Sequence, residues 1–294
     1  MGGDLLRKLL GRPRSLAPDA EEALGELAKL ADQRPALGEL ARELSAIVLA
    51  LYAEPIQEAV PALDPKKAAN KRAAGVPLLR DEPLSLDTRS FVRRWQRITE
   101  ALRRRRPDAA TLQAALGEGK LDPAWLTTEV LAGRTQAVHE RVEELQLDVP
   151  LTASVLWLSL FPVLCYLRKS LESLRQGVGW RDGFCPTCGA WPKLGEFRGL
   201  EQTRFLRCGL CADAWEFPRL RCPFCGNADH QQIGYLHVEG EETQYRAATC
   251  EACRHYVKML ATLGALPAPR LLIADLATMH LDLAAAERGY TQPL

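Results

Sequence analysis

Residues 203–227 read TRFLRCGLCADAWEFPRLRCPFCGN and contain two CxxC pairs. One further pair precedes this stretch and another follows it. The four pairs are Cys185/Cys188, Cys208/Cys211, Cys222/Cys225 and Cys250/Cys253. The chain has nine cysteines, so only Cys165 lies outside the pairs. The sequence therefore combines a cysteine-rich module with a long cysteine-poor remainder.

The order of the pairs predicts two groups of four cysteines. Nineteen residues separate the first pair from the second, which fits the C-x2-C-x15–20-C-x2-C spacing of a four-thiolate site, and 24 separate the third from the fourth. Grouping the two middle pairs instead leaves ten residues between them and the outer pairs far apart. CPTCG opens the first group and CPFCG the second, and an aromatic β-like run follows the second pair of each. These similarities favour a tandem repeat of one small fold.

The spacing within each pair suits a tetrahedral metal site. Two residues between cysteines allow a tight turn to direct both sulfurs at one ion, and N–H groups of the turn can hydrogen-bond the thiolates. Pro186 and Pro223 restrict the backbone after the first ligand, while Gly189 and Gly226 tolerate a positive φ. Two turns supply four sulfurs, the ligand set of zinc or of iron in a rubredoxin-type site. A unit of about 40 residues also benefits from the folding free energy of a metal.

Disulfides and redox CxxC chemistry are the alternatives to metal binding. Four pairs at this spacing favour metal sites, and in a reducing cytosol paired cysteines are more often metal ligands than disulfides. Both shells are full, whereas a catalytic zinc keeps one position open, so we expect no hydrolysis at these metals. Arg207 and Arg221 directly precede ligand cysteines and are placed to offset part of the thiolate charge. The histidines of the module are expected to be surface or partly buried residues: His230, His237 and His255.

Length and composition describe a globular chain of about two domains. Its 294 residues are 47% hydrophobic and 26% charged, which is ordinary for a soluble protein, and the net charge of +1 gives no bulk attraction to a polyanion. Residues 178–260 hold ten Lys/Arg and ten Asp/Glu, whereas a nucleic-acid-binding ribbon normally carries a basic face. The basic stretch from Arg89 to Arg106 is better explained as a solvated helix face than as a site for an anionic partner.

The first part of the chain, residues 19–177, predicts helices. Apolar residues recur at helical spacing over 37–51, and the proline-rich segment 61–83 predicts a long loop that is exposed or functional. The apolar run 151–167 is short for a membrane span, so we expect a buried core helix with Cys165 as a core thiol. No N-terminal apolar stretch is long enough for a secretory signal, and a cytoplasmic location is expected.

Beyond residue 177 the pattern changes to short strands. The β-like runs are 204–206, 215–217, 233–238, 245–248 and 256–260, and helical spacing resumes over 270–288. The predicted fold class is α+β, with an N-terminal all-α helical domain followed by two tandem rubredoxin-like or zinc-ribbon modules and a C-terminal helix. The predicted boundaries are 1–177 for the helical domain, 178–218 and 219–264 for the two four-cysteine metal modules, and 265–294 for the C-terminal helix.

These stretches together resemble the FdhE family of formate dehydrogenase accessory proteins. The resemblance rests on residues 203–227, FCPTCGAWP at 184–192, ATCEACRHYVKML at 248–260 and DLATMHLDLAAAERGY at 275–290, and it covers roughly residues 149–290. The order of four CxxC pairs, the aromatic run after the second pair and the C-terminal helix make it specific. One departure is Ala190, where the family more often has Ser.

The resemblance implies a cytoplasmic, non-catalytic maturation factor. Such a protein binds the catalytic subunit of a respiratory formate dehydrogenase and assists its assembly before twin-arginine export. It also implies two tetrahedral metal ions, zinc or iron, each bound by four cysteines, with no nucleic-acid partner and no membrane span; the oligomeric state stays open. The alternatives are a rubredoxin-like iron electron-transfer protein and, less favoured, a nucleic-acid-binding zinc-ribbon protein.

Overall fold

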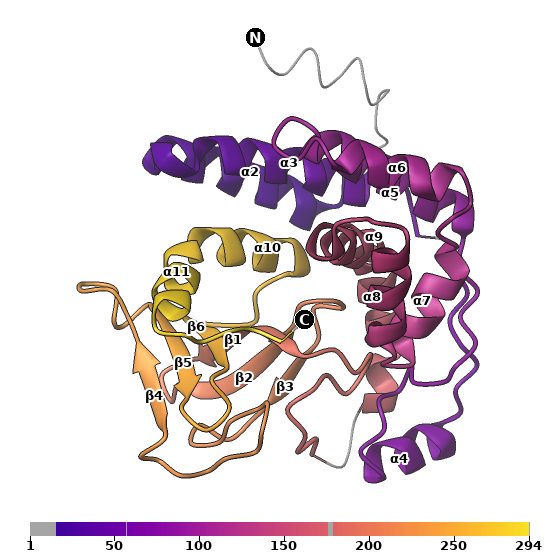
Figure 1. Cartoon of the computed structure of the whole chain (residues 1–294). Coiled ribbons are helices and arrows are strands. Elements are labelled where there is room, and N and C mark those ends of the chain that lie inside the picture. Colours follow the sequence, from indigo (N-terminus) through magenta and orange to yellow (C-terminus); the bar gives the residue numbers. More distant parts are fainter. Residues whose placement is uncertain (1–15, 57, 176–178, 294) are drawn as a thin grey trace. The chain divides into compact units, whose positions relative to one another are not determined.

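The structure is a computed structural model that describes residues 16–56, 58–175 and 179–293. The chain divides into two compact units. Unit 1 comprises Met1–Ala59, Leu86–Glu129 and Thr135–Pro162, and unit 2 comprises Val60–Ser85, Val130–Arg134 and Val163–Leu294. In the described part of the chain, unit 1 is helical and unit 2 carries the strands (Figure 1). This confirms the predicted α+β class, while the predicted domain boundaries stay predictions.

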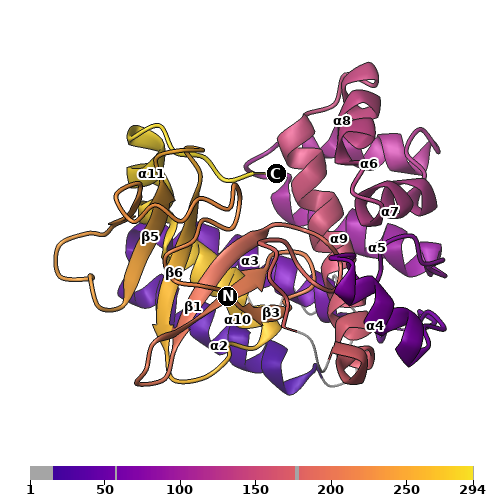
Figure 2. The same ribbon diagram turned by 90° about the horizontal axis from the view of Figure 1, so that it is seen from below.

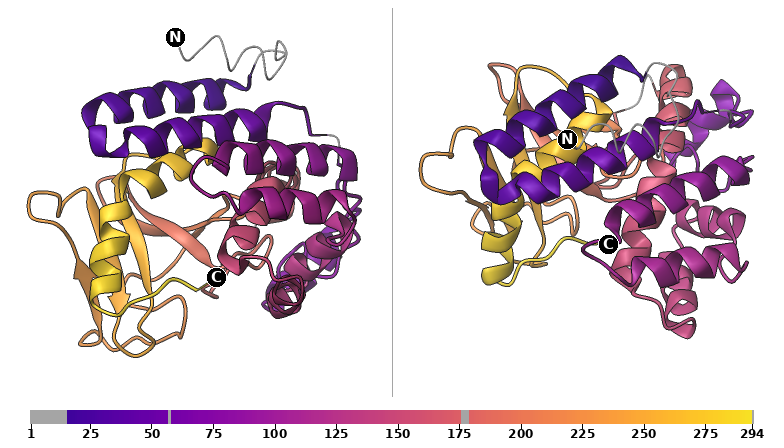
Figure 3. Two further views of the ribbon diagram at one scale, coloured as in Figure 1. Left: turned by 45° about the horizontal axis from the view of Figure 1, so that its top comes forward. Right: turned by 90° about the horizontal axis from the view of Figure 1, so that it is seen from above.

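Unit 1 is built from helices that bury their apolar faces. Its elements are α2 (Pro18–Gln33), η1 (Pro35–Leu37), α3 (Gly38–Tyr52), α5 (Thr88–Leu102), α6 (Ala109–Gly117), most of α7 (Pro123–Leu131), α8 (Thr135–Glu144) and the first part of α9 (Val149–Ser170). Helices α2 and α3 lie side by side in both views of Figure 3, and they bury Leu27 and Val48 completely. Helix α5 begins where the Asp87 carboxylate accepts hydrogen bonds from the amides of Arg89 and Ser90.

Helix α9 is the apolar helix expected from the sequence. Among the described residues it is the one helix long and apolar enough to cross a membrane, and 56% of its most apolar 18-residue window is buried. Val155, Leu160, Leu164 and Leu167 are fully buried. This burial favours the predicted core helix over a span, because a lipid-facing helix would expose those side chains.

Unit 2 is organised around one six-stranded sheet. Its strands are β1 (Pro192–Arg198), β2 (Thr203–Cys208), β3 (Ala214–Glu216), β4 (Ile233–Leu236), β5 (Tyr245–Cys250) and β6 (Tyr256–Thr262). The strand order is β3-β2-β1-β6-β5-β4, with antiparallel pairing inside each half and a parallel pair, β1 with β6, between the halves. The two repeats predicted from the sequence are therefore joined edge to edge, the first strand of one beside the third strand of the other.

The strand β1 had no counterpart among the predicted β-like runs, although it lies in the middle of the sheet. Its sequence, PKLGEFR, has a glycine and three charged residues and lacks clear alternation. Glu196 is nevertheless fully buried, because its carboxylate pairs with Arg207 of β2 and accepts a hydrogen bond from the Leu266 amide at 3.1 Å. A charged residue can thus occupy a central strand when the rest of the fold supplies its partners.

The predicted C-terminal helix is present and is broken at Thr278 into α10 (Ala268–Ala277) and α11 (Met279–Glu287). Both helices supply a carboxylate to Lys258 of β6, whose side chain is fully buried. The Lys258 Nζ lies 2.6 Å from Asp275 Oδ1 and 2.7 Å from Asp282 Oδ2. Helix α11 lies against β5 and β6 (Figure 1), and its Leu281 and Ala285 pack with Ala247 and Tyr256 of the sheet.

Segment 61–83 is not the exposed loop that its prolines suggested. It contains α4 (Pro65–Ala73), capped by the Asp64 side chain, and then runs against the first cysteine turn. Leu78 and Leu79 are buried, and their amides donate hydrogen bonds to the carbonyls of Pro186 and Thr187 at 2.9 and 2.8 Å. The segment is therefore part of the support of the cysteine-rich region in unit 2.

Candidate metal centres

The structure brings the eight paired cysteines into two clusters of four, grouped as predicted. In cluster 1 the sulfurs of Cys185, Cys188, Cys208 and Cys211 lie within 4.8 Å of one another, and in cluster 2 those of Cys222, Cys225, Cys250 and Cys253 do the same. In each cluster, two Sγ–Sγ pairs lie across the CxxC turns, at 3.5 Å for both pairs of cluster 1 and at 3.6 and 3.7 Å in cluster 2. A tetrahedral shell with metal–sulfur bonds of ~2.3 Å needs sulfurs about 3.8 Å apart, whereas a disulfide needs ~2.05 Å.

All four CxxC turns share one backbone design. The amide of the residue after the second cysteine donates to the carbonyl of the first cysteine, at distances of 2.9 to 3.1 Å. That residue has a positive φ in every turn: 85° at Gly189, 56° at Ala212, 75° at Gly226 and 58° at Arg254. In cluster 1, amides of each turn also point at the first sulfur, from Thr187 and Leu210 at 3.4 and 3.3 Å. The expected amide–thiolate contacts are confirmed there.

Hydrogen bonding in cluster 1 favours ionisation of one sulfur, that of Cys208, while hydrogen bonds among the thiols raise the pKa of Cys188, and burial together with such bonds raises that of Cys211. Burial by itself raises the pKa of the Cys208 thiol, but hydrogen bonds from the neighbouring thiols and from the Cys211 amide outweigh it and hold this pKa well below its usual range. A thiolate is the form that binds a metal. The donor set and the sulfur spacing therefore both fit zinc or iron, and the role of the eight cysteines as ligands stays a prediction.

The two clusters differ in their access to solvent. All four cysteines of cluster 1 are at most 2% exposed. In cluster 2, Cys222 and Cys250 are buried, Cys253 is half-buried and Cys225 is exposed. The sequence did not predict this difference, because the two groups have almost the same local motifs.

Asp213 is a buried neighbour of cluster 1 that sequence reasoning missed. Its Oδ2 accepts a hydrogen bond from the Thr187 hydroxyl at 2.6 Å and lies 3.7 Å from Cys185 Sγ, while its Oδ1 pairs with Arg175 at 2.7 Å. Burial and the nearby sulfur raise the pKa of Asp213 to about 7. The carboxylate thereby ties the first turn of the cluster, at Thr187, to the residue that follows the second turn.

The two arginines expected to offset the thiolate charge lie in different surroundings. Arg207 is buried, pairs with Glu196 and donates to the carbonyls of Ala212 and Leu266 at 3.1 and 2.8 Å. Arg221 is exposed. The Glu196 carboxylate of the unpredicted strand β1 thus engages the Arg207 guanidinium, and the expected offset of the thiolate charge stays a prediction.

The three histidines lie as expected, whereas Cys165, expected in the core, is only half-buried. His230 and His237 are exposed and His255 is half-buried. Cys165 lies in α9, and burial raises the pKa of its thiol far above the usual range, so it stays an unreactive thiol.

A row of five aromatic rings in unit 2 was not predicted. Successive ring centroids lie 5.5, 6.0, 5.7 and 5.3 Å apart along the series Trp180, Phe184, Trp191, Phe224 and His255. Phe184 directly precedes a cysteine of cluster 1, and Phe224 lies between the first two cysteines of cluster 2. The rings therefore form a continuous packed path between the surroundings of the two clusters.

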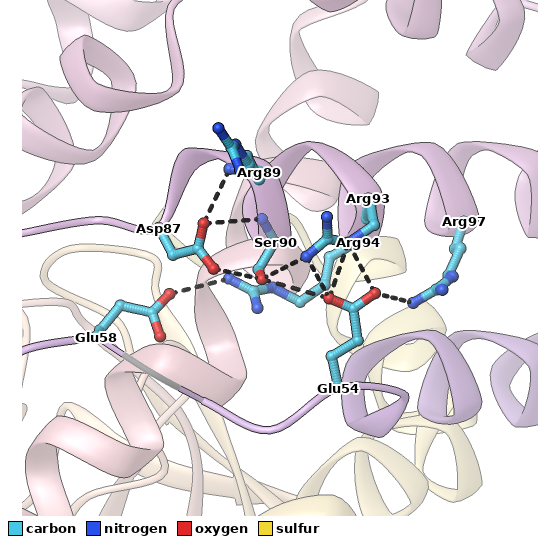
Figure 4. Close-up of polar contacts among 8 residues, drawn as sticks. All are labelled: Glu54, Glu58, Asp87, Arg89, Ser90, Arg93, Arg94 and Arg97. Carbon is cyan, nitrogen blue, oxygen red and sulfur yellow. Dashed lines mark hydrogen bonds and ion pairs between the residues drawn. The ribbon is translucent and has the colours of Figure 1, made fainter. Parts of the chain in front are cut away.

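The basic stretch from Arg89 to Arg106 lies in unit 1, and several of its arginines are paired. Arg93 Nε donates to both carboxylate oxygens of Glu54, at 2.8 and 2.9 Å, and Arg97 Nη1 donates to the same group at 3.0 Å (Figure 4). Burial alone would raise the pKa of Glu54, and these two arginines outweigh it and hold the pKa below 4.5.

Two further arginines of this stretch are also held within unit 1. Arg94 is buried, with its Nε 3.0 Å from the Ser159 carbonyl oxygen and its Nη2 3.4 Å from the Glu58 carboxylate (Figure 4). Arg106 pairs with Asp108 and Asp148 at 2.7 and 3.1 Å. These partners favour a structural role over an anionic partner site, as expected, but the expected solvated helix face is wrong for Arg94, which is buried.

The part of the chain that contains the two cysteine clusters matches known protein domains. The FdhE central domain matches residues 184–219 and the FdhE C-terminal domain matches residues 220–293. A crystal structure of the FdhE protein from Pseudomonas aeruginosa matches with a TM-score of 0.60 and 26% identity, covering 95% of both chains. Residues 184–293 therefore match the two FdhE domains, and the fold of the chain is similar to that of an FdhE protein.

Curated FdhE relatives match over the cysteine-rich part. An FdhE homologue from Stutzerimonas stutzeri is 38% identical over 129 residues, which is 43% of this chain and 41% of the relative. An FdhE protein from Escherichia coli is 31% identical over 126 residues, or 40% and 38%. The matched stretch thus spans less than half the length of these relatives. The likeness to the FdhE family is strongest where the two cysteine clusters lie.

Proposed function

We propose that the chain is a cytoplasmic, non-catalytic accessory protein that binds the catalytic subunit of a respiratory formate dehydrogenase and assists its assembly before twin-arginine export. The observation that carries the proposal is the pair of complete four-cysteine clusters in a chain whose residues 184–293 match the two FdhE domains. A full sulfur shell stabilises a fold and leaves no position for substrate. This supports a binding protein over a hydrolytic metalloenzyme.

In this proposal the bound metals, zinc or iron, stabilise the fold of the surface that binds the partner. Cys185, Cys188, Cys208 and Cys211 would bind one ion, and Cys222, Cys225, Cys250 and Cys253 the other. Because β1 and β6 pair directly, the repeats that carry the two clusters share one sheet. Folding of either repeat then supports the other, and a metal-dependent surface can extend across both.

The test is affinity capture of the full chain from its own cells under anaerobic conditions, with co-purifying proteins identified by mass spectrometry. A Cys185→Ser/Cys188→Ser variant is run beside the wild type. We expect enrichment of a formate dehydrogenase catalytic subunit by the wild type alone. The proposal is wrong if the wild type, with both metals bound, captures no such subunit; the role of the metal is wrong if the variant captures it equally well.

A rubredoxin-like electron-transfer function is the second candidate. Its support is the row of rings from Trp180 to His255 and the exposure of Cys225, since an electron-transfer site needs access for its redox partners. An iron-loaded protein whose visible absorbance is reversibly bleached by a mild reductant, without capture of a formate dehydrogenase subunit, would favour this candidate. Phe224→Leu should then slow the electron exchange while leaving the iron content unchanged.

A further inference from the structure

Unit 2 contains a cavity of about 660 Å³ that is lined by none of the eight paired cysteines. Its volume lies in the range of ligand-binding pockets. Helix α4, strand β3 and the segments before the first and third CxxC turns line it. Figure 2 labels α4 and β3 among the elements of the chain. Buried apolar residues form one part of the lining: Leu78, Pro186, Trp215 and Phe217. We call this part the floor.

Four arginines line the same cavity. Arg72 and Arg175 are half-buried, Arg181 and Arg221 are exposed, and Glu216 is the one acidic residue among the lining residues. Arg175 is engaged by Asp213 and by the Ala214 carbonyl oxygen at 2.7 and 2.9 Å. The side chains of Arg181 and Arg221 form no ion pair with a described residue. The lining therefore combines an apolar floor with two exposed arginines, Arg181 and Arg221, whose charge no carboxylate among the described residues neutralises.

The positive charges of Arg72 and Arg175, both in the cavity lining, repel each other. Burial, followed by the charge of Arg175, lowers the pKa of Arg72. A bound anion would relieve this repulsion, and guanidinium groups bind carboxylates through two parallel hydrogen bonds. This excess of positive charge contrasts with the balanced charge of residues 178–260 as a whole.

We propose that this cavity binds an acidic peptide segment of a protein partner, with an apolar side chain on the floor and flanking carboxylates on Arg181 and Arg221. The inference rests on the proposed function, because the partner that supplies the segment is the protein being matured. The floor argues for a peptide over a free inorganic anion, since an anion would use the arginines and leave the apolar surface without a partner. The confinement of the charge to one cavity argues against a nucleic acid, which needs a continuous basic surface.

The decisive variant reverses the two exposed charges, Arg181→Glu/Arg221→Glu. The matched control is Arg89→Glu/Arg104→Glu, which makes the same change in net charge at two exposed arginines of unit 1. Arg221 precedes Cys222, so the metal content and melting temperature of each variant are measured first. Arg181→Glu alone, four residues before the nearest cysteine, serves if the double variant loses metal.

Binding is measured for the full metal-loaded chain with two ligands. One is a fluorescein-labelled peptide Asp-Glu-Leu-Phe-Glu-Asp, compared with its amide counterpart Asn-Gln-Leu-Phe-Gln-Asn and with inorganic phosphate as competitor. The other is the purified formate dehydrogenase catalytic subunit. We expect the charge reversal to weaken both affinities on the order of tenfold or more, the control to change them little, and added salt to weaken wild-type binding.

The outcomes separate this inference from the proposed function. If the wild type binds the subunit and the charge reversal binds it equally well, the cavity is not the docking site although the function stands. If the wild type binds no subunit, the proposed function fails and this inference fails with it. If phosphate displaces the acidic peptide at equal concentration, or the amide peptide binds as well as the acidic one, the acidic-peptide assignment is overturned.

Discussion

At the scale of single residues, the four CxxC turns show what the sequence reveals and what it hides. Glycine marks the left-handed position of two turns, at Gly189 and Gly226, and these were predicted. Ala212 and Arg254 take the same conformation without that signal. For an L-residue this conformation costs roughly 1 kcal/mol, so the hydrogen bonds and ligands of the turn must impose it. Superposing the four motifs by their cysteines would have identified both positions.

Gly183 gives a residue-scale prediction, because no side chain fits at this position. A Cβ there would lie 1.7 Å from the Pro223 carbonyl oxygen, so the segment before cluster 1 passes directly over the first turn of cluster 2. Gly183→Ala should lower the free energy of unfolding by about 3 kcal/mol, since backbone atoms must move. Chemical unfolding of the metal-loaded protein measures it. Gly264→Ala, with nothing within 4 Å, is the control, and equal stability of the two variants would contradict the packing.

At the scale of elements, most helices and strands were predicted correctly where residues near in sequence determine them. The cysteine spacing, the longer helices and most strands depend on residues near in sequence and were found, whereas the short helix α4 was missed. Strand β1 was missed because its buried Glu196 is satisfied by Arg207 of the neighbouring strand and by the amide of Leu266, which is 70 residues away in the sequence. Segment 61–83 was misjudged for the same reason, since its buried residues pack on a turn more than a hundred residues away.

The contact between the end of α3 and α5 gives a pH-dependent prediction. Glu54 has a pKa below 4.5 because of Arg93 and Arg97, so its stabilising effect is complete above pH ~5 and is lost as the pH falls through the lowered pKa. Glu54→Gln should cost roughly 0.5–1 kcal/mol at pH 7, a modest value because the arginines are partly solvated. The difference from wild type should vanish at low pH when unfolding is followed from pH 7 to 3. A difference that grows on acidification would contradict this assignment.

At the scale of the whole molecule, two nearly identical motifs end in different environments. One repeat is covered by segment 61–83 and by Arg175 with Asp213, whereas Cys225 of the other remains exposed. The sequence of each motif fixes the shell of sulfurs, and only the packing of the complete unit decides how well that shell is protected. A chelator can attack an exposed sulfur directly but reaches a buried cluster only after local unfolding.

Metal removal should therefore proceed in two phases. We expect one equivalent to leave cluster 2 rapidly and a second to leave cluster 1 more slowly, on the order of tenfold or more, because the opening of a buried site adds free energy to the barrier. Release is followed with a colorimetric chelator on the full chain. Cys222→Ser/Cys225→Ser should abolish the fast phase, and Cys185→Ser/Cys188→Ser should abolish the slow phase while the helical signal of unit 1 persists, since the paired cysteines all lie in unit 2. A single phase for both equivalents would mean that the shared β1–β6 pair makes the clusters open together, and that the exposure of Cys225 does not govern metal exchange.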